Sequence, residues 1–120
     1  MSACLFTIAS ITHEHHHITA VLQIDVDNAI LKGHFPGHPV VPGASMLQVT
    51  KEVLEEVLNA PLQLKKGNQL KFMNLVDPTQ TTEVQLEISY HLKEDGIHAS
   101  TKLLDGDTVC FKMSGVFVRA

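Results

Sequence analysis

The sequence is poor in cysteine, which limits both its covalent chemistry and the compartment it suits. Cys4 and Cys110 are its two cysteines. They are too few for a disulfide framework and do not have the spacing of metal ligands. Residues 1–10 also lack the basic start and the long apolar stretch of a secretory leader. We therefore expect a reduced, cytoplasmic protein.

Clustered positive charge and long apolar runs are also missing. The net charge is −4 and the sequence pI is about 6.0. Lys65 and Lys66 form the longest run of basic residues, which argues against a nucleic-acid surface. No stretch approaches the length of a membrane-spanning helix. We expect one domain, residues 1–120, with neither nucleic acid nor a membrane as a partner.

Hydrophobic periodicity predicts strands around one long helix. Residues 44–58 place Met46, Val49, Val53 and Val57 on one helical stripe, and residues 59–61 end the helix. Residues 17–26 alternate most clearly between apolar and polar side chains. The other predicted strands are residues 5–12, 69–75, 84–91, 97–104 and 109–118. A long helix followed by an antiparallel run of strands predicts an α+β domain with the helix on one face of the sheet.

Four histidines lie within residues 13–17, between the first two predicted strands. This segment either turns the chain or continues the edge of the sheet. Histidines two positions apart on a strand share a face and could hold a transition metal. No cysteine or carboxylate set at a recognised spacing completes such a site, so we expect no metal there.

Residues 33–43 read Gly-His-Phe-Pro-Gly-His-Pro-Val-Val-Pro-Gly and run directly into the predicted helix. Each proline fixes its own φ and disfavours the helical region for the residue before it. The loop should therefore be rigid and should hold His34 in place. Gly43 lets the backbone approach a ligand closely at the start of the helix, where unpaired N–H groups point outward. An imidazole and an oxyanion site are thus predicted together.

This run resembles the signature loop of the 3-hydroxyacyl-[acyl-carrier-protein] dehydratases, which is similar to Gly-His-Phe-Pro-x-x-Pro-x-Met-Pro-Gly. Val41 stands where the family has methionine. Weaker likeness continues through Lys71 and Phe72 to Asp77 and Pro78 and into the last predicted strands, so the resemblance covers most of the chain. The resemblance implies a hot-dog fold, in which an antiparallel sheet wraps around a long central helix, and no cofactor. It also implies that a set of loop and helix residues contacts the substrate: Phe35, Pro36, Val41, Pro42 and Ala44.

Removing water from a 3-hydroxyacyl thioester takes three groups. His34 suits the proton abstraction from C2, because an imidazole titrates near the operating pH. The Gly43 N–H, with the helix dipole behind it, suits stabilisation of the developing oxyanion. The family supplies the acid for the leaving hydroxyl from a helix Glu or Asp, but that position here is Gln48. An amide cannot give up the proton.

Several readings of Gln48 remain open. Without the resemblance it is an ordinary residue of the polar helix stripe. Within a site it could hold a water, while Glu52, one turn further on, or protonated His34 supplies the proton. Three functions follow: a weak or heteromeric dehydratase, a non-catalytic binder of acyl thioesters, or an acyl thioesterase. The acyl-chain length would depend on the depth of a pocket to which side chains of both subunits contribute.

The resemblance also implies partners. In the family the site lies between two subunits, so His34 of one chain should face Gln48 of another. We expect a homodimer, a heterodimer with an acid-bearing paralogue, or a higher oligomer. The substrate should arrive on an acyl carrier protein, which is acidic. The candidate docking residues are Lys65, Lys66 and Lys71.

Overall fold

The computed structural model describes residues 5–25, 41, 43–78 and 80–120. Its elements are β1 (Phe6–Glu14), β2 (His17–Ile24), α2 (Gly43–Leu58), β3 (Leu62–Phe72), β4 (Glu83–Lys93), β5 (Gly96–Asp105) and β6 (Thr108–Arg119). Within the described residues, no helix is both long enough and apolar enough to cross a membrane.

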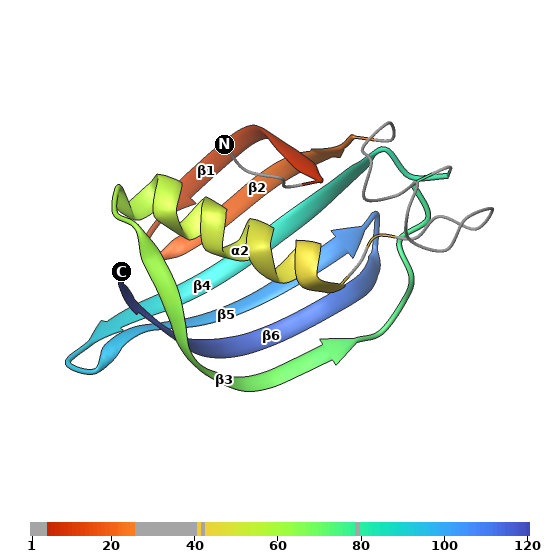
Figure 1. Ribbon diagram of the computed structural model, residues 1–120. Coiled ribbons are helices and arrows are strands. Elements are labelled where there is room, and N and C mark those ends of the chain that lie inside the picture. Colours follow the sequence, from red (N-terminus) through yellow and green to blue (C-terminus); the bar gives the residue numbers. More distant parts are fainter. Residues whose placement is uncertain (1–4, 26–40, 42, 79) are drawn as a thin grey trace.

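The strands form a six-stranded sheet in the order β1-β2-β4-β5-β6-β3, and each neighbouring pair is antiparallel. The sheet curves around α2, which lies across one of its faces (Figure 1). β1 and β3 are the two edge strands. Because α2 leads directly into β3, the chain passes from the helix to the edge of the sheet opposite β1.

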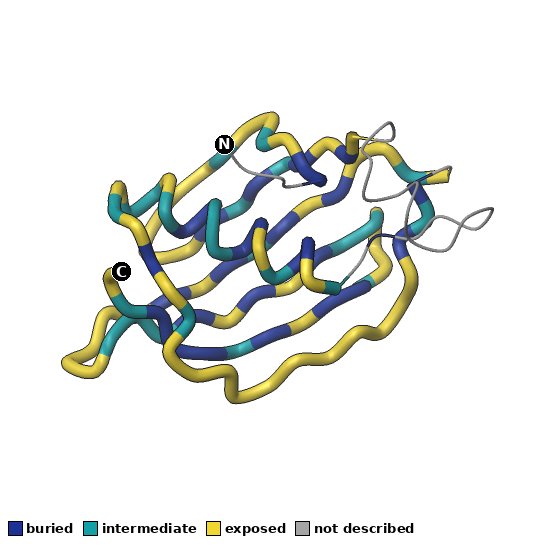
Figure 2. Tube along the Cα trace, in the orientation of Figure 1, coloured by how far each residue is buried: buried dark blue, intermediate teal, exposed yellow. Residues whose placement is uncertain are grey.

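Alternation along the strands sets which face is buried. Ile18, Ala20, Leu22 and Ile24 of β2 are buried, as are Val84, Leu86, Ile88 and Tyr90 of β4. They pack beneath the buried stripe of α2, which includes Met46, Val49, Val53 and Leu54. Figure 2 shows this core between helix and sheet, whereas β3 is exposed along most of its length. The sheet face turned away from α2 is consequently polar.

The helix ends where the sequence predicted, through a specific backbone arrangement. Asn59 has a positive φ of 53°, and the Ala60 N–H donates to the Glu55 carbonyl at 3.3 Å. This pairing is that of a Schellman motif, in which asparagine is an accepted substitute for glycine. Pro61 follows, so the helix cannot continue. The predicted helix, residues 44–58, differs from α2 by one residue at its start.

The prediction for β3 was wrong at both ends, since residues 69–75 were expected and the strand is Leu62–Phe72. Its first half contains Lys65, Lys66 and Gly67 instead of an alternating apolar pattern. Two register irregularities, at Leu64/Lys66 and Gly67/Gln69, further break the period of two. Beyond Phe72 the N–H groups of both Met73 and Asn74 donate to the Cys110 carbonyl, which ends the regular ladder.

The histidine segment combines both predicted behaviours. β1 continues through His13 to Glu14, and His15 and His16 then form the turn with φ values of 49° and 63°. Positive φ at both central residues is the feature of a type I′ hairpin turn. His13 Nε2 and the Tyr90 hydroxyl form a hydrogen bond of 2.7 Å. The described residues contain no group of three or more His, Cys, Asp or Glu that could hold a metal ion.

Candidate functional site

The structure describes part of the predicted site. His34, Phe35, Pro36 and Pro42 lie outside the described residues. The remaining predicted residues are found at the start of α2 and just before it: Val41, Gly43, Ala44 and Gln48. Their surroundings define what this end of the helix can contribute.

Val41 joins the chain before α2 to the segment that follows β3. It is 4% exposed, and its N–H donates to the Val76 carbonyl at 3.0 Å. Val76 is itself fully buried. The backbone just before the helix is thus anchored to the segment that follows β3. A buried valine also explains how the methionine position of the family pattern can accept this residue, because both side chains are apolar.

Gly43 opens the helix directly beneath an aromatic ring. A Cβ placed on Gly43 would lie 2.6 Å from Cε1 of Phe72. The Phe72 ring also stacks on Phe111, with centroids 5.1 Å apart, yet the residue remains 58% exposed. Glycine is therefore required for this close approach. The first turn of α2 contains no acidic residue. No carboxylate in that turn therefore neutralises the positive end of the helix dipole.

Phe72 is the residue of this site that sequence reasoning did not assign. Its only signal was the weaker family likeness around Lys71 and Phe72. The contact with Gly43 joins residues far apart in the chain, and local periodicity carries no information about it. The ring forms an apolar wall beside the helix N-terminus.

Gln48 lies on the exposed face of α2, one turn after the exposed Ala44. Its Nε2 donates to Glu52 Oε2 at 3.0 Å. This is the i,i+4 contact expected of neighbours on one helical stripe. Glu52 is thus directly coupled to the amide that replaces the expected acid.

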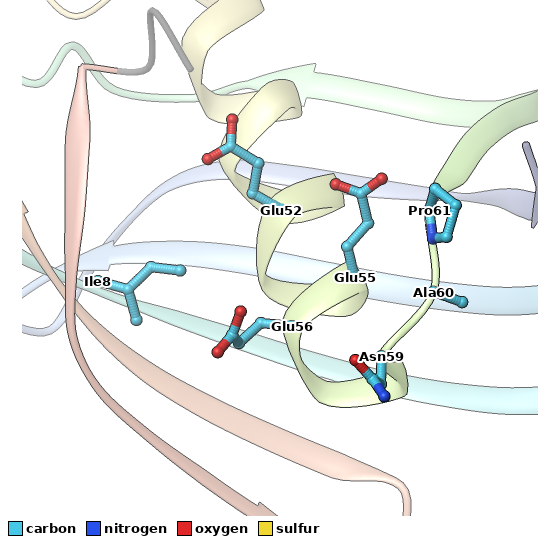
Figure 3. Close-up of a pocket in the computed structure, with 7 residues that line it drawn as sticks. All are labelled: Ile8, Glu52, Glu55, Glu56, Asn59, Ala60 and Pro61. Carbon is cyan, nitrogen blue, oxygen red and sulfur yellow. The ribbon is translucent and has the colours of Figure 1, made fainter. Parts of the chain in front are cut away.

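The polar stripe continues into a hollow beside β1. Its volume is about 480 Å³, and its lining residues are Ile8, Glu52, Glu55, Glu56, Asn59, Ala60 and Pro61 (Figure 3). Glu55 has a structural task, since its Oε2 accepts the Leu62 N–H at 2.8 Å at the start of β3. Lys51 Nζ lies 4.0 Å from the same oxygen. The hollow is acidic and is therefore unsuited to an anionic group.

The three predicted docking lysines are exposed but not clustered. Lys71 precedes Phe72 near the start of α2, while Lys65 and Lys66 belong to the first half of β3. β3 begins near the end of α2 and finishes near its start (Figure 1). Lys71 is accordingly the docking candidate nearest to Gly43.

Solved structures identify the class of fold. The chain matches the dehydratase heterocomplex ApeI:P from Xenorhabdus doucetiae with a TM-score of 0.77 and 17% identity, covering 95% of this chain and 98% of that one. It matches an uncharacterized protein from Erwinia carotovora with a TM-score of 0.71 and 20% identity, over 96% and 95% of the chains. The fold is therefore the hot-dog fold, as predicted.

Sequence comparison narrows this class to a family. The 3-hydroxyacyl-[acyl-carrier-protein] dehydratase FabZ of Latilactobacillus sakei is 26% identical over 95 residues, which cover 73% of this chain and 68% of the relative. FabZ of Campylobacter curvus is 24% identical over 104 residues, covering 76% and 70%. The model of the ApeI-like family, described as ApeI dehydratase, matches residues 10–110. The chain belongs to the ApeI-like dehydratase family, which confirms the predicted resemblance to these dehydratases.

Proposed function

We propose that this chain is a subunit of a dehydratase that acts on 3-hydroxyacyl thioesters carried by an acyl carrier protein in the cytoplasm. The pathway would be the synthesis of a fatty acid or a polyketide or polyene-type chain. The observation that carries the proposal is the start of α2, where Gly43 lies beneath the Phe72 ring and Gln48 follows on the exposed face. Membership of the ApeI-like dehydratase family supports the same reading.

In the proposed reaction His34 takes the proton from C2 of the substrate. The electron pair moves toward the thioester carbonyl, whose oxygen accepts a hydrogen bond from the Gly43 N–H. The pair then forms the double bond between C2 and C3 as the C3–O bond breaks. The departing hydroxide takes a proton and leaves as water. Preorganised N–H donors at a helix start stabilise the intermediate charge without reorganisation.

The proton for the leaving hydroxyl is the step that Gln48 cannot supply. Glu52 is bound to the Gln48 amide and could pass a proton through an intervening water. A second route is a mixed dimer in which the other chain carries the carboxyl group. The ApeI:P structure is described as a dehydratase heterocomplex, which supports this second route.

The exposed edge of the sheet suits such pairing. Large apolar side chains gather at the end of β3 and just after it: Leu70 is 43% exposed, Phe72 58%, Met73 50% and Leu75 77%. Exposed apolar side chains on an edge strand favour association with another chain. A partner seated here would approach Gly43, because Phe72 touches both the edge and the start of α2.

Gln48→Glu tests the proposal. A near-isosteric carboxyl at this position should raise dehydration of a 3-hydroxyacyl thioester by up to about 10²–10⁴-fold. His34→Ala in the same background should abolish the gain, because the acid needs the base. Absorbance of the unsaturated thioester measures dehydration, and free-thiol release measures hydrolysis. Gln48→Asn is the matched control, since it keeps an amide.

Two results would contradict the proposal. One is a folded Gln48→Glu protein that dehydrates the substrate no faster than the original chain, both alone and mixed with an acid-bearing relative. The chain would then be a binder of thioesters. The other is thiol release without an unsaturated product, which would make it a thioesterase. A mixed complex that is active when its partner carries the acid would instead establish the heteromeric form.

A further inference from the structure

The sheet face turned away from α2 carries two neighbouring rows of residues that cross the strands in register. The first row, here called the lysine row, consists of Lys71 on β3, Lys112 on β6 and Lys102 on β5, each the direct partner of the next. Glu87 on β4 continues it. The second, the serine row, consists of Ser114, Ser100 and Ser89 on β6, β5 and β4.

The lysine row concentrates positive charge on an otherwise acidic chain. The chain has nine Lys and Arg residues in all and a net charge of −4. Like charges placed directly opposite one another destabilise a sheet. Lys102 Nζ is offset by Glu87 Oε1 at 3.9 Å. Among the ion pairs of the described residues, none involves Lys71 or Lys112, so the excess charge is centred on Lys112.

A hollow of about 250 Å³ lies between the two rows. Lys102, Lys112 and Glu87 line it on the side of the lysine row, and the three serines line it on the other side. Gln69 also borders it. His17 closes the β2 end, where its Nδ1 and the Ser89 hydroxyl form a hydrogen bond of 3.0 Å. Ser89 and Ser100 are exposed and Ser114 is half-buried. Because serine side chains are short, a group small enough to enter the hollow can meet their hydroxyls and the lysine ammonium groups together.

We propose that this hollow binds the phosphate group of a small phosphorylated ligand. The ammonium groups of Lys112 and Lys102 would neutralise its charge, and the Ser100 and Ser114 hydroxyls would donate to its oxygens. Glu87 borders the site on the β4 side, where its negative charge is partly offset by Lys102. An acidic protein surface fits less well, because a carboxylate has two oxygens, whereas a phosphate group offers three to the ammonium groups and hydroxyls together. This site is separate from the start of α2.

Titration of the full chain at low salt tests the proposal. The probes are inorganic phosphate and glycerol 3-phosphate, followed by calorimetry and by amide chemical shifts. Lys112→Gln should weaken binding by about tenfold or more, since it removes a charge-assisted contact. Ser100→Val should do the same by filling the hollow with a side chain that suits a strand. Lys93→Gln, which removes the same charge from the exposed end of β4, is the matched control.

Each outcome decides the proposal. Phosphate binding that responds to Lys112→Gln and Ser100→Val but not to Lys93→Gln supports it. Equal weakening by Lys93→Gln would reveal diffuse attraction and overturn it, as would the absence of binding at millimolar ligand. Attachment to vesicles that contain phosphatidic acid, without binding of glycerol 3-phosphate, would assign the surface to lipid headgroups. Lys112→Gln should leave dehydration of a small acyl thioester unchanged, so failure here is distinct from failure of the proposed activity.

Discussion

The two ends of α2 differ in their carboxylates: the first turn has none, whereas Glu55 in the last turn binds the start of β3. A helix dipole favours acidic residues in the first turn and basic residues in the last, and α2 has neither. At its start, Gly43 lies against the Phe72 ring and the first turn carries no carboxylate, the arrangement on which the proposed oxyanion site rests. At its end, Glu55 holds β3 by accepting the Leu62 N–H. The end of the helix thus serves the connection to β3, whereas the start is where we propose that the substrate binds.

The largest effect on activity is expected from a substitution that fills the space beside the first residue of α2. Gly43→Ala, made in the Gln48→Glu background, places a Cβ 2.6 Å from the Phe72 ring and must displace it. The ring is exposed and can swing away, so the free energy of unfolding should change by less than about 1 kcal/mol. Alanine keeps the backbone N–H, so the loss comes from the added methyl group and the displaced ring, which crowd the proposed oxyanion position. Dehydration should fall by up to about 10²-fold, the loss typical of an oxyanion donor that no longer reaches its acceptor. Kinetics and urea unfolding measure the two quantities.

Gly67→Ala is the matched control for this change. Gly67 lies on β3, and its added Cβ would meet nothing closer than Leu70 Cδ1 at 3.5 Å, an ordinary contact. Activity should therefore be unchanged in the control. Equal loss of activity in both variants would mean that the close approach at Gly43 has no special role in the reaction.

The end of the helix should respond in stability instead. Glu55→Ala removes the acceptor for the Leu62 N–H and should lower the free energy of unfolding by about 1.5–3 kcal/mol, as expected for a hydrogen bond to a charged group. Glu55→Gln retains an acceptor oxygen and should lose less. Glu56→Ala changes an exposed neighbour and serves as the control. If Glu55→Ala and Glu56→Ala were equally stable, the contact with Leu62 would not hold β3.

The same contrast explains what the sequence could reveal. α2, β2 and β4 were predictable because one face of each is buried and the period of 3.6 or 2 is unbroken. β3 was not, because an edge strand with two irregularities loses that period. The sequence placed Gln48 and Glu52 one turn apart on the polar stripe of α2, and in the structure that helical spacing brings them into a hydrogen bond. The Gly43–Phe72 contact depends on tertiary packing, and the role of His34 stays a prediction.

A smaller and more selective effect is expected from adding charge at the start of α2. Ala44→Asp places a carboxylate in the first turn, which should stabilise the protein by about 0.3–1 kcal/mol through the helix dipole. The same charge opposes the developing oxyanion. A unit charge within about 10 Å contributes about 1–2 kcal/mol at an effective dielectric of about 20, so dehydration should fall roughly tenfold. Ala44→Asn separates charge from size, and an unchanged rate for Ala44→Asp would place the oxyanion elsewhere.

The smallest effect is the corresponding change at the other end. Glu56→Gln removes a carboxylate from the last turn and relieves its i,i+4 repulsion with Glu52, so the free energy of unfolding should rise by about 0.3–1 kcal/mol. The gain should shrink at high salt, because exposed charges are screened. Glu94→Gln, which removes the same charge from the β4–β5 turn, should change stability less. Dehydration should be unaffected, since Glu56 lies in the last turn of α2, whereas Gly43 opens the first. If Glu56→Gln lowered the activity as much as Ala44→Asp does, both ends of α2 would take part in the reaction. The inferred difference between the two ends would then be wrong.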